Sequence, residues 1–180
     1  MSASLENTIN QISSTEPRWF AVYTKFKCEK FVAELLRKKN IETYVPLINR
    51  TKRYERKIKH YQLPLINCYV FVLITQKEYL SVLETEYVLK FLRQGKDLLA
   101  IPFEEIQTLK KVAGDIEAVE ATHKYEFLPG EDVEVISGSL TGLRGKIIDK
   151  SGKKSFAVEL ENIGFQLRIN IDLKLLVPVK

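Results

Sequence analysis

The chain has 180 residues and a net charge of +5, with 45% hydrophobic and 28% charged residues, a composition that is typical of globular proteins and excludes extensive low-complexity or disordered sequence. Its longest mostly apolar run, Leu63–Ile74, is too short to cross a bilayer, and the opening MSASLENTIN lacks a signal-peptide pattern, so we expect a cytoplasmic protein with no membrane partner. The length suffices for two domains, and their charges differ, since residues 18–100 carry a net charge of +9 and residues 101–180 one of −2.

The first half of the chain alternates between strand and helix patterns. After a flexible N-terminus expected at 1–16, the run WFAVY at 19–23 predicts a strand. Residues 27–39 have apolar side chains at three- and four-residue spacing and end in three basic residues, as suits the negative end of a helix dipole. CYVFVLI, at 68–74, has no alternating polar residue and predicts a central strand covered on both faces. Further strands are predicted at 42–48 and 88–93, and helices at 76–83 and from Pro102 to Gly114.

The second half changes character after an acidic, weakly patterned stretch at 115–127, which predicts a linker. Five short apolar stretches follow, separated by turn-rich segments, and predict a small barrel of SH3 type. These stretches are VEVI, GKIID, FAVELE, FQLRINI and LLVPV. We therefore expect an α+β protein with an N-terminal domain at 17–114, an antiparallel sheet flanked by helices, and a C-terminal β-barrel at 128–180.

Four stretches in this order resemble the NusG family of transcription elongation factors, which have an N-terminal NGN domain and a C-terminal KOW domain. They are RWFAVYTKFKCEK, PLINCYVFV, FLRQGKDLLAIPFEEI and FLPGEDVEVISGSLTGLRGKI. The last looks like the KOW motif, with Gly138, Gly142 and Gly145 at the family's spacing. Where the general factor usually has Phe-Pro-Gly before the tyrosine, this chain has Ile66, Asn67 and Cys68. This departure favours a specialised paralogue of the RfaH type or of the capsule-operon antiterminator (UpxY) type.

The resemblance implies that the NGN domain binds the clamp helices of the largest RNA polymerase subunit through an apolar, aromatic pocket. The matching residues are Tyr23, Ile66, Tyr69, Phe71 and Phe91. Aromatic side chains offer a large contact area at a small cost in rotamer entropy, as such a contact requires. The alternative is that these residues form the core of the sheet.

A cationic run with interleaved aromatic residues precedes the apolar strand. Lysine and arginine contacts to phosphate give salt-dependent affinity, and aromatic rings can stack on unpaired bases. The resemblance implies non-template or upstream DNA as the partner, whereas a solvated hairpin whose charges discourage edge pairing is the alternative. The candidate nucleic-acid-binding residues, including two in the preceding segment, are Lys25, Lys27, Arg50, Lys52, Arg53, Arg56, Lys57 and Lys59.

In the barrel, the three KOW glycines are expected to form turns. Ile163 and Phe165 flank Gly164 at a predicted hairpin tip. Related positions in the family meet a small-subunit ribosomal protein or the termination factor Rho, and burial within the barrel is the alternative.

The sequence has no pattern typical of a catalytic or metal site. It lacks GxSxG, P-loop and HExxH motifs, and its two cysteines are forty positions apart. We expect a monomer that is not an enzyme and has no cofactor or metal. Two alternatives remain, a ribosome- or RNA-binding translation protein with a KOW barrel and a general single-strand-binding module. The net negative C-terminal half counts against the first alternative.

Overall fold

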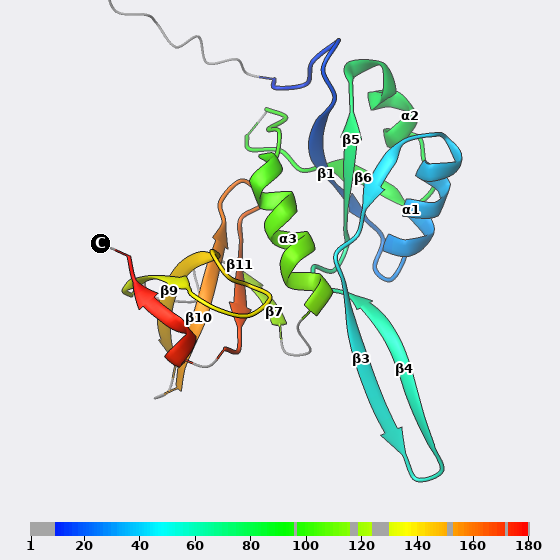
Figure 1. Cartoon of the computed structure of the whole chain (residues 1–180). Helices are drawn as coiled ribbons and strands as arrows, with labels where there is room; N and C mark the ends of the chain where they lie inside the picture. Colours follow the sequence, from blue (N-terminus) through cyan, green and yellow to red (C-terminus); the bar gives the residue numbers. More distant parts are fainter. Residues whose placement is uncertain are drawn as a thin grey trace, which may run out of the picture. The chain divides into compact units, whose positions relative to one another are not determined.

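The computed structural model describes residues 10–95, 97–115, 119–123, 130–150, 153–171 and 173–179 (Figure 1). The chain divides into two compact units. The first contains Met1–Val45 and Asn67–Pro102, and the second contains Pro46–Ile66 and Phe103–Lys180. The fold is α+β, and most strands and helices expected from the sequence are present. The strand expected at 42–48 is instead divided between two strands, Glu42–Tyr44 and Leu47–Tyr54, which belong to different sheets. Within the described part of the chain, no helix is long and apolar enough to span a membrane.

The first unit is built on a four-stranded antiparallel sheet in the order β2-β5-β1-β6. Tyr69 to Ile74 form an inner strand, as their unbroken apolar character predicts. The strands are β1 (Arg18–Thr24), β2 (Glu42–Tyr44), β5 (Tyr69–Ile74) and β6 (Val88–Phe91), and the helices are α1 (Glu29–Lys38), the 3₁₀ turn η1 (Gln76–Glu78) and α2 (Tyr79–Leu83).

Both helices lie on the same face of this sheet. Thr43 of β2 donates a hydrogen bond to the Ala33 carbonyl of α1 at 3.5 Å, and Tyr79 of α2 stacks on Phe91 of β6 with ring centroids 4.8 Å apart. The strand register places Thr43 and Phe91 on the same face as Phe20, because alternate residues of a strand point to opposite faces. The other face carries a different set of side chains, described below.

Residues 1–9 of the expected flexible N-terminus lie outside the described part of the chain. The residues that follow them are attached to the first unit by hydrogen bonds. The Gln11 N–H donates to the Leu98 carbonyl at 2.9 Å, and the Ser13 carbonyl accepts from the Gln76 N–H at 2.8 Å. Contacts to the body of this unit therefore begin before the first strand.

The second unit contains a hairpin, a helix and a six-stranded sheet in the order β12-β8-β9-β10-β11-β7. The hairpin is β3 (Leu47–Tyr54) and β4 (Lys57–Pro64), and the helix is α3 (Phe103–Asp115). The sheet contains β7 (Val119–His123), β8 (Asp132–Val135), β9 (Arg144–Lys150), β10 (Lys153–Leu160), β11 (Phe165–Ile169) and β12 (Leu176–Pro178), with the 3₁₀ turn η3 (Leu173–Leu175) before β12.

Two boundaries differ from those that the sequence suggested. The interval 115–127, expected as a linker, contains strand β7, which pairs with β11. Polar and apolar residues alternate only weakly in this interval, so the sequence pattern does not predict the strand. Backbone pairing to the neighbouring strand stabilises β7 instead. Helix α3 continues through Gly114 to Asp115 instead of stopping at the glycine.

Candidate functional site

The cationic run forms the outer part of the β3–β4 hairpin, a two-stranded ribbon (Figure 1). Every residue from Thr51 to His60 is exposed. Its base is fixed by the buried side chains of Ile48 and Leu65 and by a 2.7 Å hydrogen bond from the Leu65 N–H to the Pro46 carbonyl. Since an isolated two-stranded hairpin is marginally stable in water, this base holds the ribbon in place.

The register of the hairpin sorts its side chains onto two faces. We call them the cationic face and the polar face. The cationic face carries Arg50, Lys52, Tyr54, Lys57, Lys59 and Tyr61, and the polar face carries Asn49, Thr51, Arg53, Ile58, His60 and Gln62. Of the six cations predicted in this segment, four therefore share one face, Arg53 lies on the other, and Arg56 lies in the turn.

On the polar face, cross-strand hydrogen bonds link facing side chains. Gln62 donates to Asn49 Oδ1 at 3.1 Å, and Thr51 Oγ1 and His60 Nδ1 are 3.0 Å apart. These pairs use polar groups to hold the two strands in register. The polar face therefore contributes to the ribbon's own structure.

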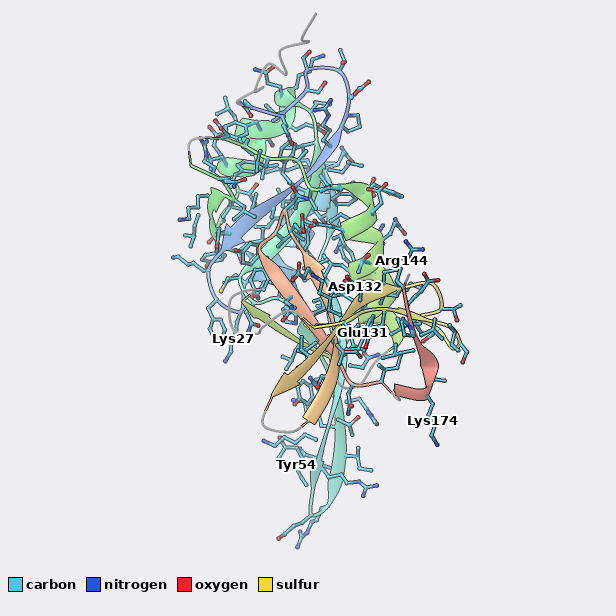
Figure 2. The ribbon with its side chains drawn as sticks, turned by 90° about the vertical axis from the view of Figure 1, so that its left-hand side faces the viewer. Lys27, Tyr54, Glu131, Asp132, Arg144 and Lys174 are labelled. Carbon is cyan, nitrogen blue, oxygen red and sulfur yellow. The ribbon has the colours of Figure 1, made fainter. Side chains whose placement is uncertain are left out.

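The cationic face has a different organisation, centred on Tyr54, whose side chain projects from the ribbon (Figure 2). The ammonium groups of Lys52 and Lys57 lie 5.1 and 5.8 Å from the centre of its ring, within cation–π range. Lys52 is directly opposite Lys59, an arrangement of like charges that destabilises a strand pair. A bound polyanion would relieve this repulsion, so the face is suited to phosphates.

Lys25 and Lys27 lie in the loop that follows β1, in the first unit. The Lys25 ammonium is 5.2 Å from the centre of the Tyr87 ring, and Lys27 projects outward from the loop (Figure 2). These two predicted residues are thus part of a separate group of aromatic and basic side chains.

Three of the five predicted polymerase-binding residues share the sheet face opposite α1 and α2. The register places Tyr23, Tyr69 and Phe71 on this face, and we call them the aromatic row. The rings of Tyr23 and Tyr69 are 4.4 Å apart, the Tyr69 hydroxyl donates to the Tyr23 hydroxyl, and the Lys90 ammonium is 5.2 Å from the Tyr23 ring centre. Burial and then the bond to Tyr23 raise the pKa of Tyr69, so its phenol remains protonated.

Exposure differs sharply within the aromatic row. Tyr69 is 4% exposed and Phe71 is 0% exposed, whereas Tyr23 is half-buried. Ile66, immediately before the loop to β5, is also buried. Phe91 does not join the row, because it faces α2 on the opposite side of the sheet and is buried there. Tyr23 is therefore the accessible member of the predicted set.

The three KOW glycines have two different roles. Gly138 and Gly142 have φ angles of +88° and +81°, which favour glycine at these turn positions. Gly145 lies within strand β9 instead of the turn expected for it. A Cβ atom there would be 2.3 Å from the Ala157 carbonyl oxygen and 2.7 Å from Phe156 Cε2. Close packing against β10, and not a turn, explains this glycine.

The predicted partner-binding tip of the barrel contacts α3 within the second unit. Ile163 is buried and Phe165 is half-buried. Asn162, the residue before Ile163, donates two hydrogen bonds to the carboxylate of Glu105 in α3. One comes from its backbone N–H at 3.1 Å and the other from its side-chain amide at 2.9 Å. Ile163 is therefore not presented to solvent in this structure.

Among the described residues there is no group of three or more histidine, cysteine or acidic side chains that could hold a metal ion. The sequence patterns did not single out Phe26 and Phe31, which are exposed in the first unit, or the half-buried Tyr87, whose ring centroid is 5.7 Å from that of Phe31. Phe31 belongs to the predicted apolar stripe of α1, and its exposure is evident only in the folded chain.

A helix-flanked antiparallel sheet, a basic hairpin and a small strand-rich C-terminal part define a modular α+β protein. The family model described as "Transcription termination factor nusG" matches residues 17–110. The chain belongs to the NusG family of transcription elongation factors.

One solved structure has a similar fold over nearly the whole chain. A structure of NusG from Thermotoga maritima, described as "Domain interaction in Thermotoga maritima NusG", is 19% identical, with a TM-score of 0.59, and the match covers 93% of this chain and 100% of that chain. The structure described as "Crystal Structure of MjSpt4:Spt5 complex conformation A" is 21% identical, with a TM-score of 0.32 and coverage of 90% and 98%. No curated protein matches the sequence.

Proposed function

We propose that the protein is a transcription elongation and antitermination factor that binds RNA polymerase and DNA together and thereby modulates pausing or termination. The observation that supports this proposal is that two kinds of side chain lie on different surfaces. Cations and tyrosines share one face of the exposed hairpin, whereas the aromatic row lies on the sheet of the first unit. Family membership supports this function. Such a factor acts in the cytoplasm, as a monomer and by binding alone, without catalysis or a cofactor.

The polymerase contact is assigned to the aromatic row. Tyr23 offers a partly exposed ring with a hydroxyl already bonded to Tyr69, and the cation of Lys90 lies beside it. An amphipathic helix pair, such as the clamp helices of the largest polymerase subunit, would meet both an apolar and a polar group there. Ile66 was also predicted for this contact but is buried in the second unit, and the position of Phe91 gives it a structural role on the opposite face of the sheet.

The DNA contact is assigned to the cationic face of the hairpin. Arg50, Lys52, Lys57 and Lys59 would contact phosphates of the upstream duplex or of the non-template strand. Binding at this face while the aromatic row holds polymerase would link the two parts of the elongation complex. This arrangement favours continued transcription.

The barrel would recruit a further partner through Ile163 and Phe165, a small-subunit ribosomal protein or Rho. Because Ile163 is buried in this structure, this contact would require rearrangement of the tip. The residues Ile66-Asn67-Cys68 support a specialised paralogue of the RfaH or capsule-operon antiterminator type.

The test is retention of the full chain on immobilised RNA polymerase core enzyme, with wild type beside Tyr23→Ala. Its control is Leu80→Ala, which changes an exposed side chain of α2 on the other face of the sheet. We expect Tyr23→Ala to weaken retention about tenfold, which corresponds to about 1.4 kcal/mol, and Leu80→Ala to leave it unchanged. Absence of wild-type retention would overturn the function, and equal losses in the two variants would exclude the aromatic row as the contact. Phe71 is unsuitable for this test because truncation of a fully buried phenylalanine costs about 3–5 kcal/mol of stability.

A further inference from the structure

The six-stranded sheet of the second unit contains one strand more than the sequence predicted for the barrel. The additional strand is β7, which lies beside β11 (Figure 1) and pairs with it in antiparallel register along its whole length, Val119–His123. β7 stands at the end of the sheet order, so β11 would be an edge strand without it. Only residues 116–118 separate β7 from α3, and residues 124–131 separate it from β8. The chain therefore covers an edge of its own barrel with a segment of the stretch expected as a linker.

The strand β11 is an integral part of the barrel, whereas β7 depends on β11. Leu167 and Ile169 of β11 are fully buried, and the whole of β11 also pairs with β10. In the described part of the sheet, β7 pairs with β11 alone, and its weak alternation of polar and apolar residues gives it little strand preference of its own. Displacement of β7 would leave β10 and β11 paired and would expose a row of backbone N–H and C=O groups on β11. Such an edge can accept another extended segment as a strand.

Two polar residues of β11 determine the chemistry of a matching strand. Arg168 lies directly opposite Glu120 of β7, and opposite charges at facing positions stabilise a strand pair. Gln166 lies opposite Thr122 and is only 3% exposed, and no described group donates a hydrogen bond to its Oε1. A buried acceptor without a donor lowers stability. β7 therefore places an acidic residue opposite the arginine but leaves a buried amide oxygen unsatisfied, so a strand with a suitable donor would fit better.

We propose that the edge of β11 is a binding site for an extended segment of a partner protein, and that β7 is an internal competitor that the partner displaces. The matching segment has an acidic residue opposite Arg168 and an amide side chain opposite Gln166, and its backbone pairs with Phe165–Ile169. Because β7 is attached by short connections, its effective concentration at this edge is on the order of millimolar. Weakly binding segments are therefore excluded. The inference rests on the proposed recruitment of a partner by the barrel, and it adds the mode of binding and the control of access.

The experiment measures the binding of fluorescent peptides with the sequence of residues 116–126 to the full chain. The test variant, the opened chain, is Ala121→Pro/Thr122→Pro, because alternate residues of an antiparallel strand donate to the neighbouring strand and one of the two prolines removes such a donor. We expect the opened chain to bind the wild-type peptide about tenfold or more tightly than the wild-type chain does, since the tethered competitor is gone. The peptide that carries both prolines is the control and should bind neither chain.

Two further peptides test the chemistry of the site. A Thr122→Gln peptide should bind the opened chain about fivefold more tightly than the wild-type peptide, because its amide can donate to Gln166. Arg168→Glu in the opened chain should weaken binding of the wild-type peptide about fivefold, and a Glu120→Lys peptide should recover that loss. Equal affinities of these peptides for both chains would contradict the predicted register.

Hydrogen exchange on the wild-type chain provides a test that does not depend on any variant. The amides of β7 should exchange about tenfold or more faster than those of β10, because β7 opens while the rest of the barrel stays folded. Equal protection of the two strands would refute a displaceable β7. Loss of the β10 protection in the opened chain would also refute it, since β7 would then be essential to the barrel.

The remaining outcomes identify the occupant. Failure of the opened chain to bind the wild-type peptide, with the β10 amides still protected, would refute the site. A dimer of the wild-type chain that the opened chain does not form would assign the edge to a second copy and overturn the proposed partner. Polymerase retention is a separate measurement, so a chain that fails it but binds the peptides as expected disproves the proposed function and leaves the strand site intact.

Discussion

Individual residues at the ends of the first unit's strands determine the conformation of the loops there. Glu29 is the clearest case, because its buried carboxylate accepts the backbone N–H of Cys68, a residue with a positive φ angle. Burial and, next, the negative charge of Glu29 raise the pKa of the Cys68 thiol, which therefore stays protonated. One side chain thus links α1 to the start of β5.

Glu29→Ala should lower the free energy of unfolding by about 1–3 kcal/mol, because it leaves a backbone donor at a strained position without its acceptor. Glu29→Gln should lower it less, since the amide oxygen can still accept the bond. Urea unfolding followed by circular dichroism measures both changes. Equal losses in the two variants would show that the charge, and not the hydrogen bond, provides the stabilisation.

Two phenols, the half-buried Tyr44 and the buried Tyr69, make the protein sensitive to alkaline pH. Burial raises the pKa of Tyr44, and burial followed by the bond to Tyr23 raises that of Tyr69. Because folding favours their protonated forms, their contribution to stability is complete below the unfolded-state pKa of about 10 and is lost as pH rises above that value toward the folded-state pKa. Titration of phenolate absorbance should show that Tyr44 and Tyr69 are among the tyrosines, of eight in the chain, that ionise late. Tyr44→Phe/Tyr69→Phe should reduce this late fraction, and ionisation of all eight near pH 10 would contradict the assignment.

At the scale of the element, the hairpin and the barrel strands derive their properties from register. In the hairpin, adjacent residues point to opposite faces of the ribbon, so Lys52 lies on the cationic face and Arg53 on the polar face. In the barrel, Gly145 lies where β9 approaches β10 closely. Neither distinction follows from residue type alone.

Lys52→Gln should reduce the salt slope of DNA binding by about 0.7–0.9, corresponding to one phosphate contact. Arg53→Gln removes the same charge from the neighbouring position and should change the slope much less. Loss of the Lys52–Lys59 repulsion should also leave stability unchanged or slightly raised. Anisotropy titrations over a range of salt concentrations provide the measurement. If the two variants behave alike, net charge and not the orientation of the face governs binding.

Gly145→Ala should destabilise the barrel by about 1–3 kcal/mol, because the added methyl group overlaps the Ala157 carbonyl and the Phe156 ring. Thermal unfolding by circular dichroism measures the loss. Gly138 is a useful comparison, since a Cβ there has free space and the cost arises only from its positive φ angle. A Gly145→Ala protein as stable as wild type would mean that the β9–β10 contact relaxes at little cost.

For the whole molecule, the two proposed contacts should respond differently to salt. Phosphate contacts weaken as counterions compete, whereas aromatic contacts are not screened. Raising the salt concentration from 50 to 200 mM should therefore reduce DNA affinity about tenfold or more, with a much smaller effect on polymerase retention. Parallel anisotropy and retention assays test this. Equal salt sensitivity would indicate that polymerase binding is itself electrostatic.

The sequence by itself determined the order of most elements, the α+β class, the central position of β5 and the family, because these follow from local periodicity, turn chemistry and motif spacing. It also located the basic segment and the KOW glycines. Only the tertiary structure decided which side chains share a surface. Strand register separates Phe91 from Tyr23 and Arg53 from Lys52, backbone pairing forms β7 in a weakly patterned stretch, and loop contacts bring Phe26, Phe31 and Tyr87 to the same end of a sheet. Such placement depends on pairing between distant segments, which no local pattern specifies.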